Sequence, residues 1–128
     1  IPVINQFRQL DVSAGGQGAP LVPIGDHYLF SKFADGFLNL GGFANISCQQ
    51  NTLQIAYDIA PANLPMNRWM QSIGKSYDQN GALARSGSVD LATYQKVMDL
   101  EFFKLTGPKS LGTEWLEQAY LPLFEALS

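Results

Sequence analysis

The sequence predicts an α/β fold, a mixed sheet with flanking helices, and three observations carry this prediction. Residues 37–63 form a long apolar stretch with a polar break, which is typical of two consecutive strands. Helical patterns with start and stop signals follow that stretch. Finally, 46% of the 128 residues are hydrophobic, which is enough for one domain with one core.

At the amino terminus, residues 1–7 alternate weakly and predict a short strand, with Pro2 confined to its beginning or to a sheet edge. A loop with three glycines among residues 15–18 comes next. Such a loop lets the backbone approach a ligand and presents N–H groups. Because it lacks the Lys-Ser/Thr ending of a phosphate-binding loop, a flexible turn is an equally good interpretation.

Residues 21–33 have the pattern of an apolar helix that carries His27 beside Asp26. A histidine in this place could act as a general base. A single histidine without a second catalytic motif is more often a packed or surface residue. The sequence therefore does not favour catalysis at His27.

The central stretch supplies the expected strands. Gly41 and Gly42 lie inside the first strand and mark either a bulge or a place where a ligand approaches the backbone. Gln50 and Asn51 predict a hairpin-type turn before the second strand. The residues expected to face the core are Leu38, Leu40, Phe43, Ile46, Leu53, Ile55 and Ile59.

Asp58 is the carboxylate of this stretch, and it has no cation beside it in the sequence. It comes near the carboxyl end of a strand and ahead of a helix predicted over residues 64–73, with Asn63 as N-cap. In α/β proteins ligands bind at this position. Asp58 could act as a base toward a water or a sugar hydroxyl. It could equally cap the following helix or pair with Arg68, and the residues alone do not decide.

The rest of the chain is predicted to be helical, with helices over residues 82–85, 91–100 and 113–120. Asp90 is the expected cap of the second of these, and Pro122 kinks or splits the last. The loop over residues 106–112 carries Lys109 and Ser110, which resemble the end of a phosphate-binding loop. Because Pro108 precedes the lysine and no strand leads in, the segment predicts only a loop with a cation.

Composition excludes several classes of function. The net charge is −3 and the eight Lys and Arg residues form no patch, which argues against a nucleic-acid partner. No apolar run approaches the roughly 20 residues of a membrane span. Cys48 has no second cysteine to pair with, and one cysteine with one histidine argues against a zinc site. We expect a cytoplasmic protein and, since the sequence begins at Ile1, a piece of a longer one.

Six segments of the chain, in one order, resemble motifs of a single family, the anhydro-N-acetylmuramic acid kinases of bacterial peptidoglycan recycling. The longest, GGQGAPLVP at residues 15–23, matches a specific nine-residue signature. The other five are Phe7-Arg8 with Asp11, LNLGGFANI at 38–46, YDIAPAN at 57–63, KSYDQNG at 75–81 and PKSLGTEW at 108–115.

The resemblance implies an ATP-dependent kinase that hydrolytically opens 1,6-anhydro-N-acetylmuramic acid and phosphorylates its 6-oxygen. It also implies a partial actin-like, or ribonuclease H-like, sugar kinase fold with a ligand cleft between two domains. Residues 1–36 would be the end of the first domain, with the sugar-binding loop, and residues 37–128 the start of the second. Family members also suggest a homodimer.

The same resemblance assigns roles to seven residues. It implies that Asp58 is the catalytic base that activates the water attacking the anomeric carbon. It implies that Mg²⁺ accompanies ATP and is held mostly by phosphates and water, with no protein ligand. The residues implied to bind sugar are Arg8, Gln17, Gly18 and Asn63, and those implied to line the nucleotide phosphates are Gly41 and Gly42.

The chain departs from the family pattern at several positions. Gln6 stands where the pattern has Asp, and Ile59, Ala60 and Ala62 replace Thr, Gly and Gly after the proposed base. We expect the isolated 128-residue chain to be inactive, because the resemblance covers only the middle of a family member. The alternative is a non-catalytic sugar-binding or structural remnant of that family.

Overall fold

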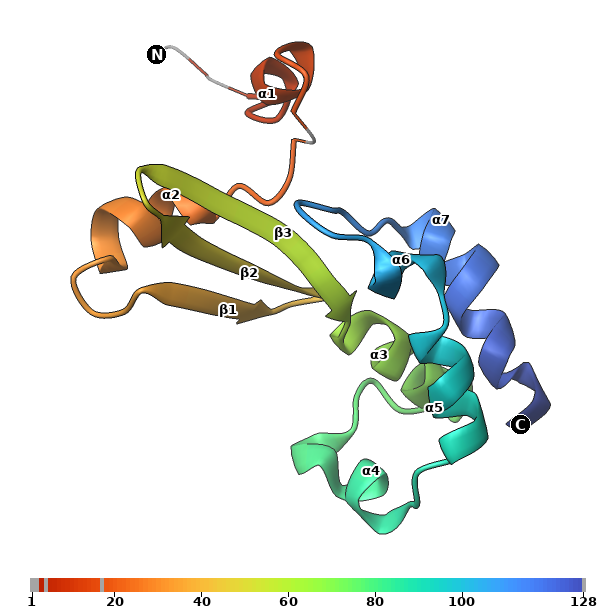
Figure 1. Ribbon diagram of the computed structural model, residues 1–128. Coiled ribbons are helices and arrows are strands. Elements are labelled where there is room, and N and C mark those ends of the chain that lie inside the picture. The colour runs from red at the N-terminus through yellow and green to blue at the C-terminus, as the bar shows by residue number, and fades with distance from the viewer. Residues whose placement is uncertain (1–2, 4, 17, 128) are drawn as a thin grey trace.

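The computed structural model describes residue 3 and residues 5–16 and 18–127. Its sheet has three strands in the order β1 (Gly36–Leu40), β2 (Phe43–Gln50) and β3 (Leu53–Pro61), antiparallel throughout (Figure 1). The α/β class is therefore confirmed, and the pairing among the described residues is antiparallel rather than mixed.

Two hairpin turns join the three strands. Gly41 and Gly42 form the turn between β1 and β2, so they do not interrupt a single strand. The expected pair of strands is in fact three, because a glycine pair fits a tight turn as well as a bulge. The predicted hairpin turn is confirmed, but it lies one residue later, at Asn51 and Thr52, with Asn51 at a φ of +56°.

Helices flank the sheet at both of its ends (Figure 1). Before the sheet lie α1 (Gln9–Ser13), α2 (Pro23–Gly25) and the π-helix η1 (Asp26–Phe30). After it come α3 (Asn63–Ser72), η2 (Gln79–Gly81), α4 (Ala82–Ser86), α5 (Leu91–Met98), α6 (Glu101–Lys104), α7 (Thr113–Trp115), η3 (Leu116–Tyr120) and η4 (Leu121–Leu127).

Aspartate carboxylates accept backbone N–H groups in the first turn of two of these helices, and the one at Asp90 was predicted. Asp90 accepts the N–H groups of Ala92 and Thr93 at the start of α5. Its pKa is lowered, chiefly by the hydrogen bond from the Thr93 side chain. The pKa of Asp78 is lowered as well, because its carboxylate accepts backbone N–H groups from Ala84 and Leu83 in α4.

The prediction that Asn63 caps the next helix is wrong. Ala62 occupies the N-cap position of α3, which has no side-chain cap bond. The Asn63 side chain instead donates from Nδ2 to the carbonyl oxygen of Leu40 at 2.9 Å. The amide therefore ties the helix start to the end of β1.

The strand expected over residues 1–7 is not found in its described part. Val3, Asn5 and Gln6 have no regular structure, Phe7 lies in a turn, and residues 1, 2 and 4 lie outside the described residues. A strand needs a hydrogen-bonded neighbour, and none of the described residues pairs with this segment. A short helix, α1, lies between this segment and the expected glycine loop.

Apart from Ala44 in β2, the buried hydrophobic residues lie outside the sheet. Leu38, Leu40 and Leu53, expected to face the core, are exposed, because no layer of described residues covers them. The buried hydrophobic residues are Ala44, Met70, Phe102, Leu111 and Leu116.

The accessible surface is large for the mass of the chain. It measures 9568 Å², whereas a compact monomer of 14.0 kDa exposes roughly 6,700 Å². The chain is therefore more open than a self-contained domain of this size. None of the helices in the described part of the chain is long and apolar enough to cross a bilayer.

Candidate active site

Asp58 is a buried carboxylate near the end of β3, and its residue is 8% exposed. It pairs in register with Asn45, and the next pair joins Ala44 to Ala60, so Ile59 is the extra residue of a β-bulge. Bulges re-aim side chains and are frequent beside active sites. The predicted place of Asp58 at a strand end is confirmed, and the bulge falls directly after it.

The loop between α6 and α7 holds Asp58 through three hydrogen bonds. The Leu111 N–H donates to Oδ2 at 2.8 Å, and the Ser110 hydroxyl donates to the same oxygen at 3.3 Å. The Asp58 N–H donates to the Lys109 carbonyl oxygen at 2.9 Å. The two bonds to Oδ2 offset the cost of burying the carboxylate, and the third satisfies the backbone N–H. Ser110 was not among the predicted site residues, although the P-K-S segment was a signal that could have found it.

Neither structural alternative for Asp58 is observed. Arg68 forms an ion pair with Glu117, with 2.8 Å between Nη2 and Oε1. Helix α3 begins without a side-chain cap. The carboxylate is therefore held by a loop, and neither helix capping nor an ion pair with Arg68 accounts for its position.

The glycine turn lies at the same end of the sheet as Asp58 and is joined to the start of α3. The carbonyl oxygen of Gly41 accepts the Asn63 N–H at 3.1 Å, and that of Gly42 accepts the N–H groups of Ala62 and Leu64 at 3.0 and 3.1 Å. Neither glycine has a positive φ. An added Cβ would come no closer than 3.5 Å to the described atoms around it, which is ordinary contact. Packing within the described chain therefore does not require glycine at either position.

The amino-terminal glycine loop is held by two polar residues of the α1 region. Arg8 donates from Nη1 to the Gly18 carbonyl oxygen at 2.6 Å, and the Asp11 carboxylate accepts the Gly18 N–H at 2.7 Å. Gly18 has a φ of +69°, and a Cβ there would lie 2.9 Å from the Val12 side chain, so glycine is required. Gln17, the fourth predicted sugar-binding residue, lies outside the described residues.

Residues of the glycine loop and of the strand that carries Asp58 line one cavity of about 430 Å³. Gln54 and Ala56 line it, and they share a strand face with Asp58 because alternate residues of a strand point the same way. Its other lining residues are Asp11, Gly16, Ala19, Pro20, Pro23 and Pro108. The loop, β3 and the segment before Ser110 therefore border one space.

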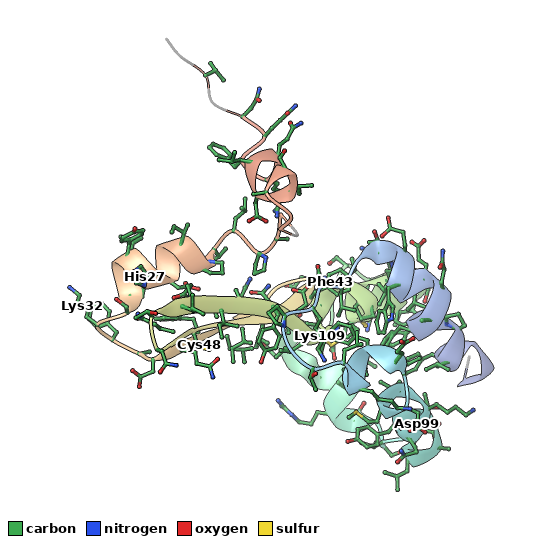
Figure 2. The ribbon with its side chains drawn as sticks, turned by 45° about the horizontal axis from the view of Figure 1, so that its top comes forward. His27, Lys32, Phe43, Cys48, Asp99 and Lys109 are labelled. Atoms are coloured by element: carbon green, nitrogen blue, oxygen red, sulfur yellow. The ribbon has the colours of Figure 1, made fainter. Side chains whose placement is uncertain are left out.

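His27 does not line this cavity. It lies in η1, and Figure 2 shows it well apart from Lys109, whose carbonyl contacts Asp58. The His27 ring meets that of Tyr28 edge-on, and its Nδ1 is buried without a described hydrogen-bond partner. In the part of the chain that the structure describes, no group of three or more His, Cys, Asp or Glu side chains is placed to hold a metal ion.

The sequence is similar to known proteins over nearly its whole length. The sequence profile of the anhydro-N-acetylmuramic acid kinase family matches residues 1–126. Anhydro-N-acetylmuramic acid kinases of Pseudomonas syringae pv. syringae, Pseudomonas fluorescens and Haemophilus influenzae are 42%, 42% and 37% identical to the chain. These matches cover 89%, 98% and 100% of this chain and 32%, 38% and 36% of the respective relatives.

The chain thus spans about a third of the length of the curated relatives it matches. The matched range of this chain spans Asp58, the glycine turn at residues 41–42 and the loop that holds the carboxylate. The chain therefore belongs to the anhydro-N-acetylmuramic acid kinase family.

Proposed function

We propose that this chain supplies the sugar-binding and water-activating part of an ATP-dependent kinase in peptidoglycan recycling. The kinase opens 1,6-anhydro-N-acetylmuramic acid and phosphorylates its 6-oxygen. The observation that carries the proposal is Asp58, a buried carboxylate at a strand end whose strand face borders the glycine-loop cavity. The names of the relatives supply the substrate and the class of reaction.

The proposed substrate determines the chemistry. Its 6-oxygen is bonded to the anomeric carbon, so it carries no hydrogen that a simple kinase could replace. In our proposal Asp58 accepts a proton from water, whose oxygen bonds to the anomeric carbon while the bond to the 6-oxygen breaks. The 6-oxygen then bonds to the γ-phosphorus of ATP, and the bond to the bridging oxygen breaks to release ADP.

We propose that Arg8, Gln17, Gly18 and Asn63 bind the sugar. Arg8 is exposed and commits only Nη1 to the loop among the described contacts, which leaves guanidinium N–H groups for a carboxylate such as the lactyl group. Asn63 commits its Nδ2 to Leu40, so its side-chain oxygen is available as an acceptor. Gly18 uses both backbone groups within the loop, and its proposed role is to shape the loop.

We propose that Gly41 and Gly42 line the phosphates of ATP. The support is that neither crowding nor backbone angle accounts for glycine at these positions. A phosphate group that approaches the turn would account for both residues, because only glycine leaves its backbone uncovered. The turn offers no carboxylate, which fits Mg²⁺ held by phosphates and water rather than by protein ligands.

We further propose an actin-like arrangement, with residues 1–36 ending one domain and residues 37–128 starting the next. The sheet begins at Gly36, and a hydrogen bond of 2.6 Å from Ser47 to Asp26 joins the two parts. A homodimer and a cytoplasmic location, where ATP is at hand, complete the proposal.

The test places this chain inside a full-length relative. The part of this chain that matches the Pseudomonas syringae kinase, 89% of it, replaces the corresponding segment of that kinase, and ADP release is measured with the anhydro sugar. We expect turnover by the chimera and none by the 128-residue chain alone, which spans about a third of that relative. A folded chimera that binds the sugar without turnover contradicts the proposal.

The second candidate is a non-catalytic sugar-binding or structural remnant of the family. It is favoured by Ile59, Ala60 and Ala62, which stand beside the proposed base where the family pattern has Thr, Gly and Gly. The combined variant Ile59→Thr, Ala60→Gly and Ala62→Gly separates the candidates. Turnover that appears only in this variant of the chimera means that the natural chain is a remnant.

A further inference from the structure

The loop that holds Asp58 is itself fixed from behind. Lys109 donates from Nζ to the carbonyl oxygens of Phe102 and Leu105, at 2.8 and 3.0 Å, at the end of α6. The same ammonium group lies 4.4 Å from the centre of the Phe102 ring. Phe102 and Leu111 are both buried. The loop that carries the two donors to Asp58 is therefore anchored to buried residues.

The hydrogen bonds make the two oxygens of the Asp58 carboxylate unequal. The Leu111 N–H and the Ser110 hydroxyl both donate to Oδ2. Among the residues that the structure describes, none donates to Oδ1. Because the two donors occupy the lone pairs of Oδ2, a proton taken up by this carboxylate goes to Oδ1.

Two donors also constrain the side chain more than one would. With Leu111 alone, the carboxylate could pivot about that single bond and change rotamer. The Ser110 hydroxyl adds a second point of attachment to the same oxygen. The direction in which Oδ1 points therefore depends on the Ser110 hydroxyl.

We infer that Ser110 is a positioning residue for the proposed base, an inference that rests on the proposed function. Its hydroxyl holds the Asp58 carboxylate in the orientation that directs Oδ1 toward the attacking water. Ser110 acts through Asp58 and not on the substrate. Lys109 has a separate part, because its side chain secures the loop to α6.

The kinetic test uses Ser110→Ala and Ser110→Thr in the chimera, with Asp58→Asn as the reference for loss of the base. Removal of one hydrogen bond should lower kcat about three- to tenfold in Ser110→Ala, with the sugar KM within about twofold. Ser110→Thr keeps a hydroxyl and should return kcat to within about twofold of the starting chimera. Unchanged kcat in Ser110→Ala, or equal losses in both variants, overturns the inference.

A second measurement does not depend on turnover. Three-bond NMR couplings from the backbone N and C′ atoms to the Asp58 Cγ report its χ1 rotamer in the 128-residue chain. We expect one rotamer in the natural chain and in Ser110→Thr, and averaging in Ser110→Ala at unchanged circular dichroism. One rotamer in all three overturns the inference. If the couplings are as expected but the chimera has no turnover, Ser110 still positions Asp58 and the proposed function is contradicted.

Discussion

Two regions of the molecule differ in how far they bury their own apolar side chains. The amino-terminal region, the described residues up to Phe33, exposes Phe7, Leu10 and Phe33 among others, and Pro23 is its buried apolar residue. The carboxyl-terminal region, from β2 to η3, contains the buried hydrophobic residues Ala44, Met70, Phe102, Leu111 and Leu116.

This difference separates two kinds of site residue. Asp58 is bound by a loop whose support is the packed carboxyl-terminal region, so this chain builds the geometry of the proposed base itself. The amino-terminal glycine loop is held by polar contacts of Arg8 and Asp11 with Gly18. We therefore expect the base to respond to changes in core packing and the glycine loop to respond to changes in a few hydrogen bonds.

Truncation of Leu116 should have the largest effect on stability. Leu116 is 0% exposed, and Leu116→Ala should lower the free energy of unfolding by about 2–5 kcal/mol through lost burial and a new cavity. Phe7→Ala is the matched apolar truncation at a residue 68% exposed, and its effect should stay within about 0.5 kcal/mol. Urea unfolding followed by tryptophan fluorescence measures both. Equal losses would remove the distinction between the regions.

Lys109→Met should have the next largest effect. The change removes two charged hydrogen bonds, to the carbonyl oxygens of Phe102 in α6 and of Leu105 just after it, and should cost about 1–3 kcal/mol. Lys104→Met is the control, because Lys104 lies 3.9 Å from Asp99 in an exposed pair worth less than about 0.5 kcal/mol. The same urea unfolding experiment compares the variants. A Lys109→Met chain as stable as the control would show that the loop needs no such anchor.

Asp11→Ala should act on the glycine loop alone. It removes the acceptor of the Gly18 N–H, and exchange of that amide should quicken about three- to tenfold. Asp35→Ala, at an exposed aspartate two residues beyond this region, is the control. NMR-detected hydrogen exchange measures both variants. If Asp11→Ala also speeds exchange at the Leu111 amide, the two regions are coupled more tightly than their packing indicates.

Acid should have the smallest effect, at the helix starts that Asp90 and Asp78 hold, and α5 is the one followed here. The hydrogen bond from the Thr93 side chain is the main cause of the lowered pKa of Asp90, so the cap stabilises the fold above the ordinary value of 3.8. That stability is lost as the pH falls from there through the lowered folded value. Amide exchange in α5 should therefore quicken over this range, and Asp90→Asn should show no such dependence at α5. The same profile in both would contradict the role of the Asp90 charge.

Local chemistry predicted the helices and the turn positions best. The Asp90 cap, the helix that starts at Ala82 and the turn at Asn51 each follow from a few adjacent residues. The glycine pair was misplaced because the same residue type suits a bulge and a turn. The exposure of Leu38 could not be predicted, because an apolar strand residue has the same pattern whether or not another layer covers it.

The site was predictable only in part for a similar reason. The strand-end place of Asp58 follows from its own stretch of sequence. Its partner Ser110 lies on a loop beyond four α-helices, α3 to α6, and joins it through tertiary packing that no residue spacing encodes. The alternatives of helix capping and pairing with Arg68 were therefore open until the contacts of Asp58 were known.

The most direct test of the proposed base is Asp58→Asn in the chimera with the Pseudomonas syringae kinase. Asn keeps the size of the side chain and its ability to accept the Leu111 N–H, but it cannot take the proton of water. We predict that kcat falls about 10²- to 10⁴-fold, while the Kd for the anhydro sugar, measured by calorimetry, stays within about threefold. A kcat within about tenfold of the unsubstituted chimera would contradict the assignment of Asp58 as the base.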